Sequence, residues 1–83
     1  MGALSALPNV GSVLEGLLGQ AGITTPEELR AVGAKEAFVR VKLIDPAACI
    51  RMLYGIQGAV DGVKDVSLPE STKQELKAFF RSL

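Results

Sequence analysis

One stretch near the start of the chain limits what the rest of it can form: a tight turn over Leu7-Pro8-Asn9-Val10-Gly11. Pro8 fixes its own φ, and Gly11 is predicted to take a positive φ or to admit a close backbone approach. An apolar helical run follows the turn directly, carried by Val13, Leu14, Leu17, Leu18 and Ala21. The pattern therefore predicts a hairpin that leads straight into a deeply buried helix.

Length and hydropathy bear on how much of the chain can be hidden. The 83 residues predict a single domain over residues 1–83. Its composition is 48% apolar, with a mean hydropathy of +0.31. A domain of this size buries only about 60–65% of the surface of its unfolded chain. We therefore expect an exposed apolar patch that is suited to a partner protein or a second copy.

Charge and residue usage narrow the possible functions. Nine basic and nine acidic residues give a formal net charge of zero, whereas domains that bind nucleic acid through charge alone are usually basic. There is no His, so the usual acid–base group at neutral pH is missing. The single Cys49 cannot form an internal disulfide, which suits a reducing compartment. No signal peptide or membrane span is recognisable, so the cytoplasm is expected.

Start signals divide the chain into short helices. Thr25-Pro26-Glu27-Glu28 places a capping Thr, a Pro at the first helical position and a Glu three residues after the cap. Asp45-Pro46 repeats the cap-then-Pro start, and Val32-Gly33 and Asp61-Gly62 are natural breaks. The sequence thus predicts an all-α bundle of about five helices, over residues 9–20, 25–31, 34–43, 46–60 and 69–83.

Glycines inside two of these helices indicate where helices come close. Gly16 and Gly19 each cost about 1 kcal/mol of helix propensity against Ala, so we expect another helix to pack against them. Gly55, Gly58 and Ala59 form a strip of small residues along the fourth expected helix. Another backbone is expected to approach that strip closely.

The order of several blocks along the chain resembles one family. The blocks are Leu7-Pro8-Asn9-Val10-Gly11, the run from Ala21 to Gly33, Ala37-Phe38, Asp45-Pro46-x-Ala48-Cys49, the run from Leu53 to Ala59, and Leu68-Pro69. Together they are similar to the C-terminal domain of TfoX/Sxy-type competence regulators. The resemblance implies a compact helical bundle with a helix-hairpin-helix-like (SAM-domain-like) core. It also implies a role in bacterial competence and transcription regulation, and in that family the domain often follows a separate N-terminal domain.

Two groups of residues are candidate nucleic-acid contacts. Backbone N–H groups of the hairpin could hold a phosphate, and a basic row on the last helix could touch a phosphate backbone. DNA-binding hairpins of this type commonly carry a Lys or Arg soon after the last Gly, but Ser12 and Val13 stand there. A packing turn and a solvated helix face are the competing interpretations. The candidates are Pro8, Asn9, Val10, Gly11 and Ser12 in the hairpin, and Lys73, Lys77 and Arg81 in the row.

No catalytic or metal-binding constellation is recognisable. Cys49 is expected on an apolar helix face as a small buried residue, and no His is present to activate it. The carboxylates show no ligand spacing, so we expect no cofactor, no metal and no small-molecule substrate. Two functions stay open. One is a non-catalytic regulatory module that binds DNA weakly. The other is a protein-interaction or self-association module, binding a regulatory protein or forming a homodimer, without direct DNA contact.

Overall fold

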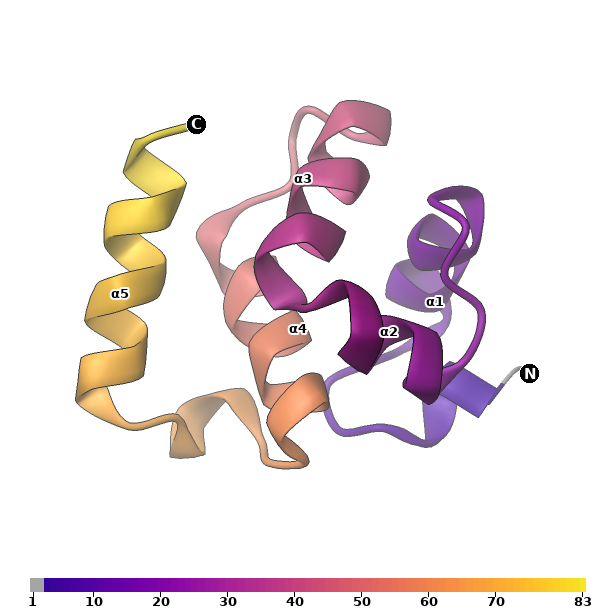
Figure 1. Cartoon of the computed structure of the whole chain (residues 1–83), viewed down its shortest axis with the longest axis horizontal. Coiled ribbons are helices and arrows are strands. Elements are labelled where there is room, and N and C mark those ends of the chain that lie inside the picture. Colours follow the sequence, from indigo (N-terminus) through magenta and orange to yellow (C-terminus); the bar gives the residue numbers. More distant parts are fainter. Residues whose placement is uncertain (1–2) are drawn as a thin grey trace.

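Helices make up all the regular structure of residues 3–83, the part of the chain that the computed structural model describes (Figure 1). Five α-helices and two short 3-10 helices follow one another, and the described residues contain no strand. The expected all-α class is thereby confirmed. The elements are η1 (Ala3–Ala6), α1 (Ser12–Gln20), α2 (Pro26–Val32), α3 (Ala34–Ile44), α4 (Ile50–Asp61), η2 (Asp65–Ser67) and α5 (Glu70–Arg81).

The helix α4 lies in the middle of the molecule and packs against α2, α3 and α5 (Figure 1). On it, Leu53 and Ile56 are fully buried and belong to the same apolar cluster as Phe38 on α3. The expected inner face of α3 is confirmed in full, because Ala34, Ala37, Phe38 and Val41 are all buried. No polar or charged residue of the described chain is buried, so the core is held by apolar contact alone.

The start of α2 follows its sequence signal closely. The Thr25 hydroxyl accepts a hydrogen bond from the Glu28 N–H at 3.1 Å, and the Glu28 carboxylate accepts one from the Thr25 N–H at 3.1 Å. The same carboxylate also accepts from the Thr24 N–H at 2.8 Å. This reciprocal capping box supplies partners for N–H groups that a helix start otherwise leaves open. At the other end, Gly33 with φ 87° separates α2 from α3.

Two helices begin later than predicted. Asn9 has a left-handed backbone, φ 69°, which no α-helix continues through, so α1 starts at Ser12 rather than near residue 9. Asp45 accepts from the Ala47 N–H at 3.1 Å with its side chain, and from the Ala48 N–H at 2.9 Å with its carbonyl. These bonds close a separate turn, and α4 starts only at Ile50 instead of near residue 46.

Three expectations about glycines have different outcomes. Gly11 has φ −95°, an ordinary value, and no atom within 4 Å of an added Cβ, so neither the predicted positive φ nor the alternative of a close backbone approach is found there. The positive φ lies at Asn9 instead. Gly16 and Gly19 are exposed and have no atom within 4 Å of an added Cβ, so no helix packs there, and α1 buries only Leu14 and Leu18.

The expected close approach at Gly58 is confirmed. A Cβ added there would lie 2.6 Å from the Val63 carbonyl oxygen and 2.5 Å from the Asn9 Nδ2 atom. The neighbouring strip residue, Gly55, meets Asn9 at ordinary contact distance. The small residues of α4 thus make room for the hairpin and for the connector that leads to η2.

Candidate functional site

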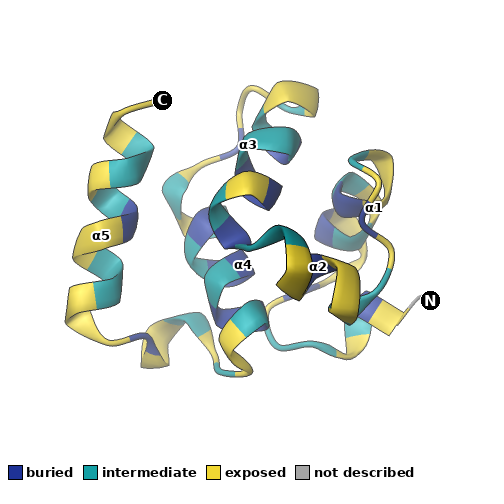
Figure 2. Cartoon of the chain, viewed as in Figure 1, coloured by how far each residue is buried: buried dark blue, intermediate teal, exposed yellow. Residues whose placement is uncertain are grey.

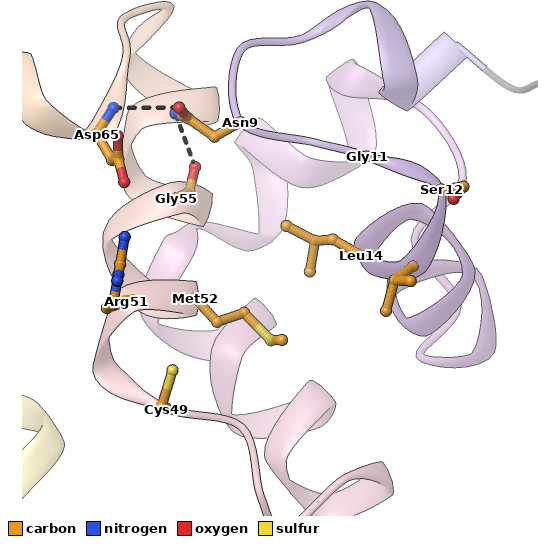
Figure 3. A pocket seen from close by; sticks show the side chains of 10 residues that line it. Asn9, Gly11, Ser12, Leu14, Cys49, Arg51, Met52, Gly55 and Asp65 are labelled. Atoms are coloured by element: carbon orange, nitrogen blue, oxygen red, sulfur yellow. Dashed lines mark hydrogen bonds between the residues drawn. The ribbon is translucent and has the colours of Figure 1, made fainter.

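The side chain of Asn9 ties the hairpin to the far end of α4. Its Nδ2 atom donates to the Gly55 carbonyl at 3.3 Å and to the Val63 carbonyl at 3.0 Å. Its Oδ1 atom accepts from the Asp65 N–H at 3.1 Å, and Figure 3 shows the amide lying between Gly55 and Asp65. We call these three bonds the Asn9 clamp. The polar atoms of this candidate contact are therefore occupied within the chain.

An open depression of about 600 Å³ lies beside the clamp, between the start of α1 and the first half of α4 (Figure 3). We call it the hairpin depression. The first turns of both α1 and α4 contribute residues to its lining, and the first N–H groups of a helix have no partner within the helix. It is lined by Asn9, Gly11, Ser12, Val13, Leu14, Cys49, Arg51, Met52, Gly55 and Asp65.

The α1 end of the depression has a partly positive character. Gly11 is the N-cap and makes no side-chain capping bond, while Ser12 is exposed. The first-turn N–H groups of a helix carry the positive end of its dipole. Of the hairpin candidates, Gly11 and Ser12 line the depression together with Asn9, whereas Val10 is buried and Pro8 is half-buried.

Arg51 supplies a positive charge at the same depression. It does so in place of the Lys or Arg that the sequence lacks directly after Gly11. It is an exposed residue in the first turn of α4, and no local pattern connects it with a hairpin 40 positions earlier. Asp65 lines the depression too and brings a carboxylate close to that cation. The depression therefore offers one arginine and helix N–H groups to a single phosphate, with a negative charge nearby.

Cys49 also lines the depression, and its expected burial is wrong. It is exposed because α4 starts only at Ile50, which leaves Cys49 as the N-cap outside the helical face. Hydrogen bonding from the backbone N–H of Met52 is the largest cause that lowers the pKa of this thiol. Burial opposes that shift, and the charge of Arg51 adds to it. No His exists anywhere in the chain to serve the thiol as a base.

The basic row lies elsewhere. Lys73 and Lys77 are half-buried and Arg81 is exposed on α5, which stands at the opposite end of the molecule from α1 (Figure 1). The fold thus separates the two groups of candidate nucleic-acid contacts, with α4 between them. Each stays a separate prediction.

Among residues 3–83, no group of three or more His, Cys, Asp or Glu residues could hold a metal ion. Nor is any helix of this part of the chain long and apolar enough to cross a bilayer.

A second, apolar hollow lies between the second half of α3 and the residues that follow α5. It has a volume of about 240 Å³ and is lined by Val39, Lys42, Leu43 and Leu83. Leu43 is 80% exposed and Leu83 is 53% exposed. The apolar surface expected from the composition is therefore present, and its leucines gave no signal of their own in the sequence.

These features define a small helical domain whose N-terminal hairpin is fastened to the end of its fourth helix. The chain belongs to the TfoX C-terminal domain family, which matches residues 1–80. It is 34% identical over 80 residues to protein Sxy of Escherichia coli (strain K12), covering 96% of this chain and 38% of Sxy. The chain thus spans about two fifths of the length of that relative.

Two solved structures share the fold. A crystal structure in a triclinic form, of an uncharacterised protein from Listeria monocytogenes, superposes with a TM-score of 0.94 at 51% identity and covers 95% of this chain and 90% of that one. A tetragonal form, described as a protein of unknown function from the same organism, gives a TM-score of 0.91 at 50% identity over 94% and 96% of the two chains. The family and the fold are thus established together.

Proposed function

We propose that this chain is a non-catalytic regulatory module of the kind found in TfoX/Sxy-type competence regulators. We also propose that it contacts nucleic acid weakly through the hairpin depression. One observation supports the second part: the start of α1, which has no side-chain cap, and Arg51 line the same depression. N–H groups at a helix start, together with a guanidinium, suit a phosphate oxygen.

The net charge of the molecule limits the affinity of the proposed contact with nucleic acid. With a net charge of zero and Asp65 beside Arg51, the long-range attraction that drives non-specific binding is small. Affinity near the weak end of ordinary non-specific binding, a Kd of about 10⁻⁴ M, is expected. Phosphate contacts position a protein without reading bases, so the proposed binding is independent of sequence.

Replacing Arg51 by Gln tests this proposal. Labelled duplex and single-stranded DNA are titrated at low salt, and binding is followed by fluorescence anisotropy. Arg51→Gln should weaken duplex binding and lower the slope of log K against log salt by about 0.9, the loss of one phosphate contact. Arg30→Gln, at an exposed position on α2, is the matched control and should leave both unchanged.

Either of two results would contradict the proposal. The first is no binding by the unchanged protein at ~100 µM, which is weaker than ordinary non-specific affinity. The second is equal weakening by Arg51→Gln and Arg30→Gln. Neutralising Lys73, Lys77 and Arg81 together in the same titration shows separately whether the basic row of α5 takes part.

A second candidate function is protein interaction or self-association without direct DNA contact. The specific observation in its favour is the exposure of Leu43 and Leu83 beside one apolar hollow. Exposed apolar surface of this kind often marks a site of association. Light scattering across a range of protein concentrations distinguishes self-association from binding to a different protein.

A further inference from the structure

The apolar hollow lies between the second half of α3 and the residues that follow α5, and Figure 2 shows both helices exposed at these ends. We call Val39, Leu43 and Leu83, with Lys42 among them, the α3–α5 surface. Leu43 belongs to the last turn of α3, and Leu83 follows the end of α5. Both leucines are more than half exposed, so nothing in the described chain covers them.

Aromatic contacts hold α5 against α3 below this surface. The rings of Phe38 and Phe80 lie 5.9 Å apart between centroids. The Lys42 ammonium lies 5.5 Å from the centroid of Phe80, and Lys35 lies 5.6 Å from that of Phe79. Both Phe79 and Phe80 are half-buried and pack against the core. Aromatic rings thus fill the contact between α3 and α5, and the apolar side chains beyond them, at the ends of the two helices, stay exposed.

The charge at this surface is positive. Lys42 is the one charged residue that lines the hollow, and its ammonium donates to the Pro46 carbonyl at 3.0 Å and to the Ala48 carbonyl at 3.1 Å. The ion pairs found among residues 3–83 are Lys35–Glu75 and Arg40–Glu36, so Lys42 has no carboxylate partner there. An ammonium has three N–H donors, and the third remains for an incoming carboxylate.

Size and charge together argue against a second copy as the occupant. Three aliphatic side chains expose on the order of a few hundred Å². A stable complex buries about 800 Å² on each partner. Two copies meeting face to face would also bring two Lys42 ammonium groups together. A short segment that brings its own acidic groups fits better than a large interface.

The domain also occurs as part of a longer chain. Sxy extends well beyond the region matched here, and the matching family is that of a C-terminal domain. A preceding domain would join this fold next to η1, at the opposite end of the molecule from the end of α5 (Figure 1). A domain joined there would not begin beside the surface, and we take the occupant to come from another protein.

We propose that the α3–α5 surface binds a short acidic amphipathic helix of another protein. That helix places a leucine-sized side chain in the hollow and a second one a turn away, over Leu43, as helices docked in apolar grooves do. A carboxylate next to these anchors accepts the third hydrogen bond of Lys42. The proposal rests on the second candidate function, protein interaction, and is independent of the contact with nucleic acid.

A designed peptide pair tests the chemistry of the occupant. The probe is a fluorescein-labelled helical peptide with Leu at i, i+4 and i+8 and Glu beside them, and its twin has Lys at every Glu position. Anisotropy titration should show tighter binding of the Glu peptide. Leu43→Glu should weaken it about tenfold or more, through lost apolar contact and like charge. Lys42→Gln should weaken it about two- to fivefold, as expected for one exposed ion pair.

The matched control is Val66→Glu, a change at a 77% exposed apolar residue on η2. It should leave peptide binding unchanged, and circular dichroism should show all three variants folded, since Leu43 and Val66 are exposed. Equal affinity for both peptides, equal weakening by Val66→Glu, or no binding of the Glu peptide at ~1 mM would each overturn the proposal. A dimer that Leu43→Glu dissolves would overturn this occupant while leaving the second candidate function standing.

Discussion

At the scale of single residues, Asn9 has the role that the sequence pattern assigned to Gly11. Of the non-glycine residues, Asn is among those that adopt the left-handed conformation most readily, and here its amide also makes three hydrogen bonds to the chain. The clamp needs a side chain that both donates and accepts, and the amide of Asn9 does both.

Two variants of Asn9 separate the contribution of its hydrogen bonds to stability from that of its left-handed backbone. Asn9→Ala removes three partly exposed hydrogen bonds and strains the left-handed backbone, so we expect a loss of about 2–4 kcal/mol in the free energy of unfolding. Asn9→Gly keeps the backbone conformation without strain and should lose about 1–2 kcal/mol less than the Ala variant. Urea denaturation measures both. Unfolding free energies equal to that of the unchanged protein would show that the clamp contributes nothing.

Two glycine-to-alanine changes should have opposite signs. In a helix interior, Ala is normally favoured over Gly by up to about 1 kcal/mol. Gly16→Ala meets no neighbour and should raise stability by about 0.5–1 kcal/mol. Gly58→Ala would place its Cβ against the Val63 carbonyl and the Asn9 amide, so it should cost about 1–3 kcal/mol. Thermal melts of both variants measure the sign of each change in stability. A stabilised Gly58→Ala variant would contradict the geometry of the clamp.

At the scale of helices, the two cap-then-Pro starts differ in one residue. Thr25 has Glu28 three positions later, and the two side chains cap each other's backbone. Asp45 has Ala48 at the equivalent position, so no reciprocal bond forms and the Asp side chain closes a turn with Ala47 instead. A helix start is predictable from four residues only when both halves of the capping box are present.

Acid should remove the contribution of Glu28 to α2. Its pKa is lowered chiefly by the hydrogen bond from the Thr24 N–H, followed by the Thr24 hydroxyl. Because the folded pKa lies below the unfolded value, the stabilisation is fully present above about pH 4.5 and is lost as the pH falls through the folded pKa. The stability gap between the unchanged protein and Glu28→Gln, measured by urea denaturation from pH 7 to pH 3, should therefore narrow below pH 4.5. A gap that stays constant would show that the carboxylate charge is not involved.

At the scale of the whole molecule, local patterns predicted the elements, and tertiary contacts decided the sites. The buried face of α3 and both ends of α2 follow from residue spacing and caps within one element. Arg51 and Gly11 line the same depression, and Cys49 is exposed, because of how α1 and the start of α4 are placed. That placement cannot be predicted from any single segment. The apolar surplus of the composition indicated an exposed patch, but only packing shows that Leu43 and Leu83 form it.

The two candidate surfaces also divide the molecule. The hairpin depression is lined from α1, α4 and the turns before them, and the α3–α5 surface is formed by α3 and the residues that follow α5. They share no lining residue. The two proposed contacts can therefore be tested with separate variants.

The Asn9 clamp also bears on the order in which the chain folds. Most helix contacts join neighbours along the chain, such as α2 with α3 and α3 with α4. The clamp instead joins Asn9 to residues 46, 54 and 56 positions away. Closing so long a loop before the helices have packed costs entropy without compensating contacts. We therefore expect these bonds to form after the transition state. Loss of the clamp should then speed unfolding and leave the folding rate nearly unchanged, which makes Asn9 a determinant of the lifetime of the native state.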